Sequence, residues 1–286
     1  MNKILVPTDF SPHADAAFDY AIQLAQKQPG EVVLLHVLHT PVNWAKLSKD
    51  QERLFPETQE AIRRARAALA ERVEKAKTKG VTVGEQLCFS DGKDQILSFV
   101  EREHASMVVM GSHGQYGWKE HMLGSNTYHV LRKARVPVLV VKNIEDPVSF
   151  NRIVFATDLK ENSGKALKQV AEFAAKMGLY LHLLYVNTPT NFLEDSQIEQ
   201  LAGEFLEKYA DSDYAVHHYS AYKEERGIIQ FAEKLGADMV AVATHGRSDL
   251  QQLFAPSVTE NLVTYLKVPV WSINLGLVGD TSTAGK

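Results

Sequence analysis

The chain contains a single cysteine, Cys88, among its 286 residues. One cysteine cannot form an intramolecular disulfide or a cysteine-based metal cluster, and its scarcity is typical of proteins in a reducing compartment. The flanking Leu87 and Phe89 are apolar, so we expect a buried, unreactive thiol on a strand. The sequence also lacks a run of about 18 apolar residues, the length that a membrane helix requires.

Charge of one sign is not in large excess, since 31 Lys and Arg face 35 Asp and Glu, for a net charge of −4. This balance predicts no general affinity for nucleic acid or for anionic membranes. The N-terminus opens with a strand pattern rather than the apolar segment of a signal peptide, so we expect a cytoplasmic protein. Hydrophobic residues at 45% and charged residues at 23% are typical of a globular protein.

Common catalytic signatures are missing from the sequence. There is no G-x-x-x-x-G-K-[ST] phosphate loop and no G-x-G-x-x-G turn after the first predicted strand. No Ser-His-Asp order, no H-E-x-x-H and no carboxylate pair with metal-ligand spacing stands out. The histidine pairs His36/His39 and His217/His218 are isolated, and we assign them to strands or to the surface. We therefore expect no catalytic residues and no metal site.

The chain carries the same pattern twice. Ile4-Leu-Val-Pro-Thr-Asp9 recurs as Ile153-Val-Phe-Ala-Thr-Asp158 at an offset of 149, and Val136-Pro-Val recurs as Val268-Pro-Val at an offset of 132. The second copy is therefore shorter by 17 residues, and we place that deletion in the stretch Thr40–Pro56 of the first copy. Such a repeat, in a chain long enough for about two domains, predicts two units of one fold.

Each copy alternates strands and helices. Continuous runs of Val, Ile and Leu suit a parallel sheet covered on both faces, and the alternation predicts α/β architecture. In the first copy we expect strands near 3–7, 31–38, 82–89, 106–111 and 137–141, and helices near 12–27, 57–79, 94–104 and 125–134. In the second we expect strands near 152–156, 180–186, 214–220, 238–243 and 269–273, and helices near 163–177, 195–210, 225–235 and 257–266. The predicted domains span 1–143 and 150–276, followed by a flexible tail at 277–286.

A glycine-rich loop follows the fourth predicted strand. The apolar run Met107–Met110 ends at Gly111, Gly114 lies in the loop, and Gly124-Ser125 opens the next helix. Glycine lets the backbone approach a ligand closely. The first N–H groups of a helix lack partners within it and lie at the positive end of its dipole. This arrangement favours phosphate binding over a loop whose glycines only make turns.

The G-x2-G-x9-G-S spacing of residues 111–125 resembles the nucleotide-binding motif of the universal stress protein family, in its ATP-binding branch. The segments Ile4–Asp9 and Val136–Val141 also resemble that family. The resemblance implies two tandem Rossmann-like domains, each a five-stranded parallel sheet in the order 3-2-1-4-5 with flanking helices. Members of the family bind ATP or AMP, or have lost that ability.

The resemblance also assigns ligand-binding residues. It places the adenosine end of the nucleotide against Pro7, Thr8, Asp9 and Val37. From the residues alone, Asp9 can instead cap the helix that begins near Pro12, and Val37 can simply be a core residue. The remaining expected contacts lie at the end of the fourth strand and on the phosphate side: Met110, Gly111, His113, Gly114, Gly124, Ser125, Asn126 and Thr127. The alternatives there are a strand role for Met110, a surface role for His113 and helix capping by Ser125 and Thr127.

The second copy departs from the glycine pattern. Ala243 stands where the first glycine is expected, and Pro256 stands at the position of Gly124. Proline supplies no N–H and cannot adopt a positive φ. We therefore expect the second copy to bind a triphosphate weakly or not at all, and to serve a structural or regulatory purpose.

The two fifth strands, Val138–Val141 and Val270–Ile273, are edge strands in the expected order, and exposed edges invite pairing. We expect them to join the domains as an intramolecular pseudo-dimer, with a homodimer as a further assembly. The extra Thr40–Pro56 stretch is expected to form a lid or to cover the neighbouring copy.

The resemblance implies a stress-response regulator that binds ATP or AMP, with or without Mg²⁺, and acts through a nucleotide-linked change in conformation or assembly. A ligand drives such a change only by binding the two states differently. Two alternatives stay open: a slow ATPase, and a structural partner-binding protein with an empty crevice.

Overall fold

The computed structural model describes residues 2–28, 30–90, 95–113, 123–142, 150–244 and 258–275. The strands and helices follow the expected alternation in both domains. The first domain contains β1 (Asn2–Thr8), α1 (Pro12–Lys27), β2 (Gly30–His39), η1 (Trp44–Lys46), α2 (Lys49–Glu52), α3 (Pro56–Thr78), β3 (Val83–Ser90), α4 (Gln95–Arg102), β4 (Met107–Gly111), α5 (Ser125–Lys133) and β5 (Val138–Val141). The second contains β6 (Arg152–Ala156), α6 (Glu161–Met177), β7 (Tyr180–Asn187), η2 (Pro189–Asn191), α7 (Asp195–Tyr209), β8 (Ala215–Ser220), α8 (Glu224–Leu235), β9 (Met239–Thr244), α9 (Val258–Tyr265) and β10 (Val270–Asn274).

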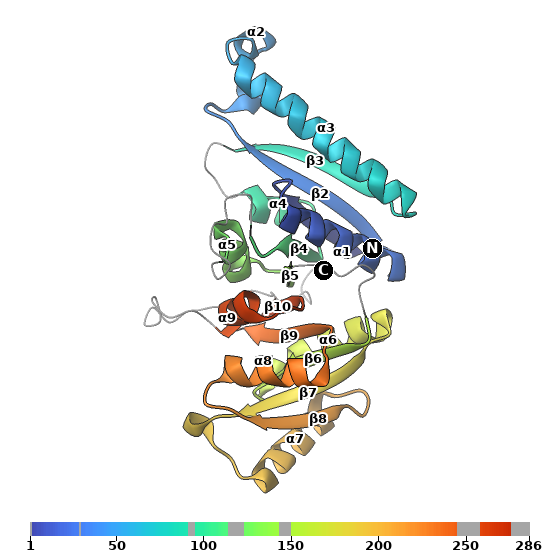
Figure 1. Ribbon diagram of the computed structural model, residues 1–286, viewed down its shortest axis with the longest axis vertical. Coiled ribbons are helices and arrows are strands. Elements are labelled where there is room, and N and C mark those ends of the chain that lie inside the picture. Colours follow the sequence, from blue (N-terminus) through green and yellow to red (C-terminus); the bar gives the residue numbers. More distant parts are fainter. Residues whose placement is uncertain are drawn as a thin grey trace, which may run out of the picture.

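The strands of the described residues form one ten-stranded sheet that runs through both domains (Figure 1). Its order is β3-β2-β1-β4-β5-β10-β9-β6-β7-β8, so each domain has the expected order 3-2-1-4-5. Pairing within each domain is parallel. β1 and β4 are neighbours, and the strand order reverses between them: the chain passes from β1 to β2 on one side and from β4 to β5 on the other. In folds of this kind, ligands bind at this point, beside the carboxyl ends of the strands.

The domains meet through their fifth strands, as the sequence predicts. β5 and β10 pair antiparallel, with Trp271 opposite Leu139. Two contacts related by the internal repeat flank this junction. The Lys142 Nζ donates to the Thr264 carbonyl in the last turn of α9, and the Asn274 Nδ2 donates to the Arg132 carbonyl in the last turn of α5, at 3.4 Å. Each domain thus supplies a donor to carbonyls at the C-terminal end of a helix in the other.

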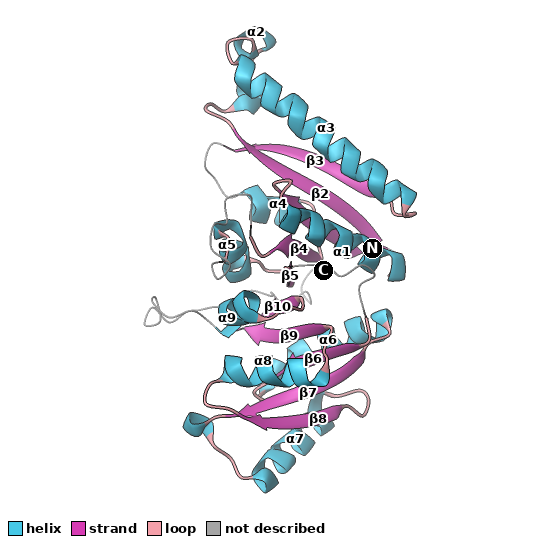
Figure 2. Cartoon of the chain, viewed as in Figure 1, coloured by secondary structure: helices cyan, strands magenta, loops and turns pink. Residues whose placement is uncertain are grey.

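Helices cover both faces of the sheet, which explains why its strands are apolar without alternation (Figure 2). One hydrophobic core lies under α1, α3, α6 and α7, and a second lies under α4, α5, α8 and α9. Each core continues from one domain into the other. In the described ranges, no helix is both long enough and apolar enough to cross a membrane.

The shortening of the second domain is divided between a loop and a helix, which corrects our placement of the whole deletion in Thr40–Pro56. The segment between strand and helix covers residues 40–55 in the first domain and only 188–194 in the second. The following helix has 23 residues in α3 and 15 in α7. The expectation that the extra stretch covers the neighbouring copy is also wrong, because α2 lies at the end of the molecule farthest from the second domain (Figure 1).

Candidate functional site

The two sequence segments of the expected site lie at one edge of the sheet. β1 and β4 pair in parallel, with Leu5 opposite Val108, so their carboxyl ends lie together. Thr8 ends β1 and Asp9 follows it, and Ser112 follows β4 at that same edge. The topology therefore brings together motifs that are about a hundred residues apart in the sequence.

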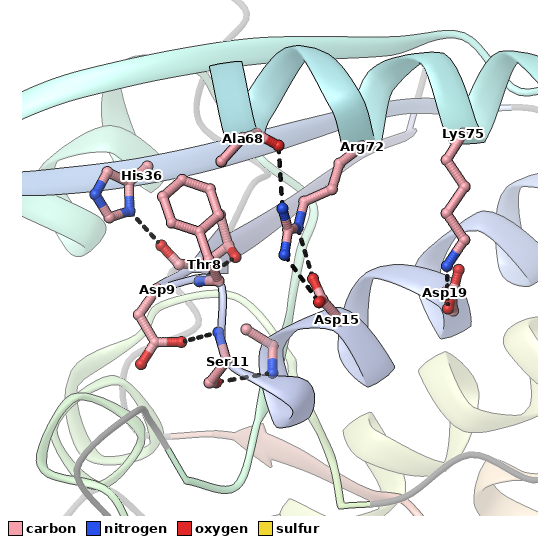
Figure 3. A network of polar contacts seen from close by, with 11 residues as sticks. Thr8, Asp9, Ser11, Asp15, Asp19, His36, Ala68, Arg72 and Lys75 are labelled. Carbon is pink, nitrogen blue, oxygen red and sulfur yellow. Dashed lines mark hydrogen bonds and ion pairs between the residues drawn. The ribbon is translucent and has the colours of Figure 1, made fainter. Parts of the chain in front are cut away.

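A tight turn links β1 to α1 and orients Asp9. The Phe10 N–H donates to the Thr8 Oγ1 at 3.0 Å, and the Ser11 N–H donates to the Asp9 Oδ1 at 3.1 Å (Figure 3). Phe10 has a φ of 65°, in the left-handed region that costs a residue with a large side chain about 1–3 kcal/mol. The turn holds this strained residue through contacts on both sides.

The helix cap corrects one expectation for Asp9. α1 is capped by Ser11, whose Oγ accepts from the Ala14 N–H at 3.2 Å. Asp9 instead accepts from the backbone of Ser11, before the helix begins. Its carboxylate therefore supports the turn and stands at the edge of the sheet, rather than closing the first turn of α1.

The ring of Phe10 lies between the side chains of His36 and Arg72, an arrangement that sequence reasoning missed. It stacks on the His36 imidazole with ring centroids 4.3 Å apart, and the Arg72 guanidinium carbon lies 4.9 Å from its centroid. Arg72 also makes a bidentate pair with Asp15, at 2.6 and 2.8 Å (Figure 3). These residues come from β2, α3 and α1, so three elements fix the strained turn.

His36 is bonded to the same turn. Its Nδ1 lies 2.8 Å from the Thr8 carbonyl oxygen, which can only accept, so Nδ1 carries the hydrogen. Burial lowers the pKa of His36, and the Thr8 hydrogen bond and the charge of Asp9 oppose that effect only in part. A neutral His36 therefore supports the loop that presents Asp9.

Gly111 is required where β4 meets α1. A Cβ at Gly111 would lie 2.7 Å from the carbonyl oxygen of His13. The Gly111 carbonyl in turn accepts from the Thr127 Oγ1 at 2.8 Å. Thr127 is buried and ties α5 to the end of β4, which corrects the capping alternative for this residue, whereas its expected contact with phosphate stays a prediction. The glycine lets two helices approach the same strand end.

The N-terminus of α5 faces this edge, and in the part of the chain that the structure describes it has no side-chain cap. Gly124, rather than Ser125, is its N-cap residue, which corrects the capping alternative for Ser125. The Gly124 N–H donates to the Ser112 carbonyl at 3.0 Å, and this bond closes the loop onto β4. Ser125 and Asn126 form the exposed first turn. Uncapped N–H groups and the helix dipole there favour an anion.

The remaining expected residues are placed as follows. Pro7 and Met110 are buried in their strands, and Val37 is half-buried in β2 against the core under α4 and α5. The His113 Nδ1 lies 2.9 Å from the Ser112 Oγ. Gly114 lies outside the described residues. The structure therefore brings the strand ends and the start of α5 to one edge.

His13 is a further residue at this edge that the sequence did not single out. It lies in the first turn of α1, its Nδ1 is 3.0 Å from the Lys142 carbonyl oxygen, and its ring centroid is 5.4 Å from that of His113. The only signal in the sequence was its place in the first turn of the helix predicted near 12–27. Among the described residues, no group of three or more His, Cys, Asp or Glu side chains forms a metal site.

The second domain has the same tight turn after its first strand, β6, but the side chains around that turn differ. Leu159 has a φ of 57° and its N–H donates to the Thr157 Oγ1, as in the first domain. The Asp158 Oδ1, however, accepts from both the Lys160 N–H and the Ser163 Oγ, at 3.1 and 2.5 Å. The Asp158 carboxylate is therefore engaged by a side chain that the first domain, with alanine at the matching position 14, lacks.

The loop after β7 also differs from its counterpart. Asn187 accepts from the Leu193 N–H at 3.1 Å and donates to the Leu193 carbonyl at 2.9 Å. Tyr185, at the position of His36, donates to the Asn191 carbonyl at 3.3 Å. Ala243, one residue before the end of β9, is half-buried, whereas Gly246, Pro256 and Ser257 lie outside the described residues.

A model of the universal stress protein family matches residues 1–142 and, a second time, residues 149–274. The chain belongs to the universal stress protein family. A universal stress protein of Methanocaldococcus jannaschii is 31% identical over 152 residues, covering 49% of this chain and 94% of the relative. A universal stress protein of Synechocystis is 22% identical over 293 residues, covering 94% of this chain and 99% of the relative.

The fold of the whole chain is shared with a solved universal stress protein. The crystal structure of a universal stress protein from Archaeoglobus fulgidus aligns with a TM-score of 0.73 at 22% identity, over 96% of this chain and 99% of that one. The tandem arrangement of two universal stress protein domains is therefore found beyond this chain.

Proposed function

We propose that the first domain binds an adenine nucleotide, ATP or AMP, at the shared edge of β1 and β4. The observation that carries the proposal is the N-terminus of α5, which has no side-chain cap among the described residues and closes onto the end of β4 beside Gly111. A phosphate there would accept hydrogen bonds from the first N–H groups of α5, at the positive end of the helix dipole. Membership of the universal stress protein family supports the adenine nucleotide as the class of ligand.

Asp9 is proposed to hold the adenosine end. One of its carboxylate oxygens accepts from the Ser11 N–H, and this bond fixes the direction of the carboxylate. An oriented carboxylate can accept hydrogens from ribose hydroxyls or from the adenine amino group. The stack of Phe10 between His36 and Arg72 is proposed to keep this carboxylate in place in the absence of nucleotide. Mg²⁺ would accompany a bound triphosphate.

The second domain is proposed to bind a triphosphate far more weakly. Its Asp158 is already engaged by Ser163, and Ala243 replaces the glycine at the end of the fourth strand.

Calorimetric titration of ATP, ADP and AMP into the full chain tests this assignment of the two domains. Asp9→Asn should lower the affinity for the preferred nucleotide by about tenfold, as expected for a lost charged hydrogen bond. The matched Asp158→Asn variant should bind as the wild type does.

The proposal is supported if one nucleotide binds per chain, with weaker binding in Asp9→Asn and wild-type binding in Asp158→Asn. Equal losses in the two variants, or no binding of any adenine nucleotide, would contradict it. Phosphate release is followed in the same samples, because sustained turnover that disappears in Asp9→Asn would favour the slow ATPase instead.

The regulatory part of the proposal requires a second state. Nucleotide occupancy is proposed to change the conformation or assembly of the chain, since a ligand shifts an equilibrium only through its different affinity for the two states. Hydrogen exchange and light scattering, each with and without saturating ATP, test this part. Identical exchange and identical mass in both conditions would leave a nucleotide-binding protein without the proposed switch.

A further inference from the structure

The residue that follows β5, Lys142, lies at the candidate site. Its carbonyl accepts from the His13 Nδ1 at 3.0 Å, and the ring centroid of His13 is 5.4 Å from that of His113. Beside it, the Ser112 N–H donates to the Val141 carbonyl at 3.0 Å. The backbone of Lys142 is therefore fixed at the carboxyl ends of β4 and β5, the edge of the sheet at which the proposed nucleotide would bind.

At this edge of the sheet α5 begins and α9 ends. Each of these helices connects two parallel strands, so it carries the chain from the carboxyl edge of its own domain back to the amino edge. Because β5 and β10 pair antiparallel, the carboxyl edge of the first domain continues as the amino edge of the second. Both helices cover the same face of the sheet, and α5 packs on both strands of the junction. The N-terminus of α5 and the C-terminus of α9 therefore share one edge and one face.

The Lys142 side chain lies on that face. Along β5, Val138 and Val140 pack in the core under α5 and α9, whereas Leu139 packs in the core on the opposite face. The alternation of side chains along a strand directs Lys142 to the side of α5 and α9. There its Nζ donates to the Thr264 carbonyl in the last turn of α9. The second domain thus holds the ammonium at the edge where α5 begins.

The ammonium of Lys142 has no acidic partner in the described part of the chain. Its one side-chain hydrogen bond there is to the Thr264 carbonyl, so two of its three donors remain for water or a ligand. Burial lowers the pKa of Lys142, and no nearby carboxylate opposes that effect. Removing a charge from water is costly unless an opposite charge and further hydrogen bonds offset the loss. An anion at this edge would supply both.

The internal repeat shows that the contact between the domains does not require this charge. Asn274 occupies the position of Lys142 in the second copy, at the same offset of 132 that relates Arg132 to Thr264. The Asn274 Nδ2 donates to the Arg132 carbonyl at 3.4 Å, which is the counterpart of the lysine contact. A neutral amide therefore reaches the helix end of the other domain, and the positive charge of the first copy calls for another reason.

The charge accompanies the glycine motif. Lys142 belongs to the copy that has Gly111 and Gly124. The neutral asparagine belongs to the copy in which Ala243 and Pro256 stand at those positions. Lysine is a common point-charge ligand of phosphate in proteins. A cation found only beside the intact motif therefore points to the anionic part of the ligand that this motif would bind.

We propose that Lys142 binds the terminal phosphate of a triphosphate in the first-domain site, and that the Thr264 carbonyl of the second domain positions its ammonium. This inference rests on the proposed nucleotide site and adds its selectivity. The first N–H groups of α5 would hold the phosphate nearest to the helix. A monophosphate held there would leave Lys142 unused, so the lysine makes the site prefer ATP to AMP.

Calorimetric titration of ATP and of AMP into the full chain, in one Mg²⁺ buffer, tests this selectivity. Lys142→Asn copies the residue of the second copy, so it removes the charge and keeps a donor for the Thr264 carbonyl. It should lower the affinity for ATP by about tenfold or more and leave the affinity for AMP unchanged. Lys142→Met takes its place if this variant does not fold. The control is Lys133→Asn, exposed in the last turn of α5 at the opposite edge, which should bind both nucleotides as the wild type does.

Acetylation of lysine amines in the wild-type chain, measured for each residue by mass spectrometry, tests the contact itself. ATP should slow the acetylation of Lys142 several-fold, AMP should not, and Lys133 should react equally in all samples. A Lys142→Asn variant that binds ATP as the wild type does, or that loses affinity for ATP and AMP equally, would overturn this inference and leave the nucleotide site in place. Acetylation of Lys142 that ATP does not slow would do the same. If the wild type binds neither nucleotide, the proposed function fails and this inference fails with it.

Discussion

At the scale of single residues, Gly111 is constrained by packing as well as by its expected ligand. A Cβ there would lie 2.7 Å from the His13 carbonyl oxygen, so Gly111→Ala must push α1 away from β4. We expect this variant to lose about 1–3 kcal/mol in the free energy of unfolding, measured by urea denaturation without nucleotide. Gly203→Ala is the control, because Gly203 lies in α7 with open space around it and should gain about 0.5–1 kcal/mol. Equal stability of both variants would contradict the packing role.

Three histidines make stability depend on pH. Burial lowers the pKa of His36, His182 and His217 in the folded protein. Below the ordinary imidazole pKa of about 6.5, the unfolded chain therefore binds more protons than the folded one. The free energy of unfolding should fall as the pH falls below that value and should gain nothing more from these groups above it.

Urea denaturation between pH 5.5 and 7.5, without nucleotide, measures this dependence. His36→Gln should make the slope shallower, because one of the three groups is removed. His104→Asn, at an exposed position with a positive φ that asparagine tolerates, should keep the wild-type slope. An unchanged slope in His36→Gln would show that His36 does not contribute.

At the scale of elements, the segment 40–55 is fixed to the end of β3 by Trp44. Trp44 is 7% exposed, and its ring centroid lies 6.3 Å from those of Phe55 and Phe89. We expect Trp44→Ala to release the segment, so that trypsin cleaves at Lys46 several-fold faster than in the wild type. Phe192→Ala, in the short loop of the second domain where Phe192 is 68% exposed, should leave cleavage at Lys46 unaffected.

The lid role of this segment stays a prediction. Replacing residues 40–55 with the loop 188–194 of the second domain should lower the affinity for ATP if the segment closes over the site. Unchanged ATP affinity in that chimera would rule the lid out.

The sequence predicted the elements and the sheet order but not the contacts that hold the site. Continuous apolar runs and the repeat are local signals, and the family resemblance supplied the order of the strands. The stack of Arg72 on Phe10 joins residues 62 positions apart and leaves no local pattern. The repeat likewise fixed the size of the deletion but not its division between loop and helix, because the extra turns of α3 follow the same helical pattern as the rest.

At the scale of the whole molecule, the β5–β10 pair uses the edge that each domain would otherwise expose. We expect the separate fragment 1–143 to pair with itself through Val138–Val141, giving a dimer by size-exclusion chromatography with light scattering. Leu139→Lys in that fragment should shift it to the monomer, because a charge would enter the middle of the new junction. A wild-type fragment that stays monomeric would show that this edge does not drive association.

The unbroken sheet also bears on how the chain loses its structure. Both hydrophobic cores cross from one half of the molecule to the other, and a strand of each half completes the hydrogen bonding of its neighbour. Melting one half would strip the other of buried surface at once, so heating in a calorimeter should give a single transition whose calorimetric and van't Hoff enthalpies agree. Two separate peaks would mean that the halves come apart before either of them melts.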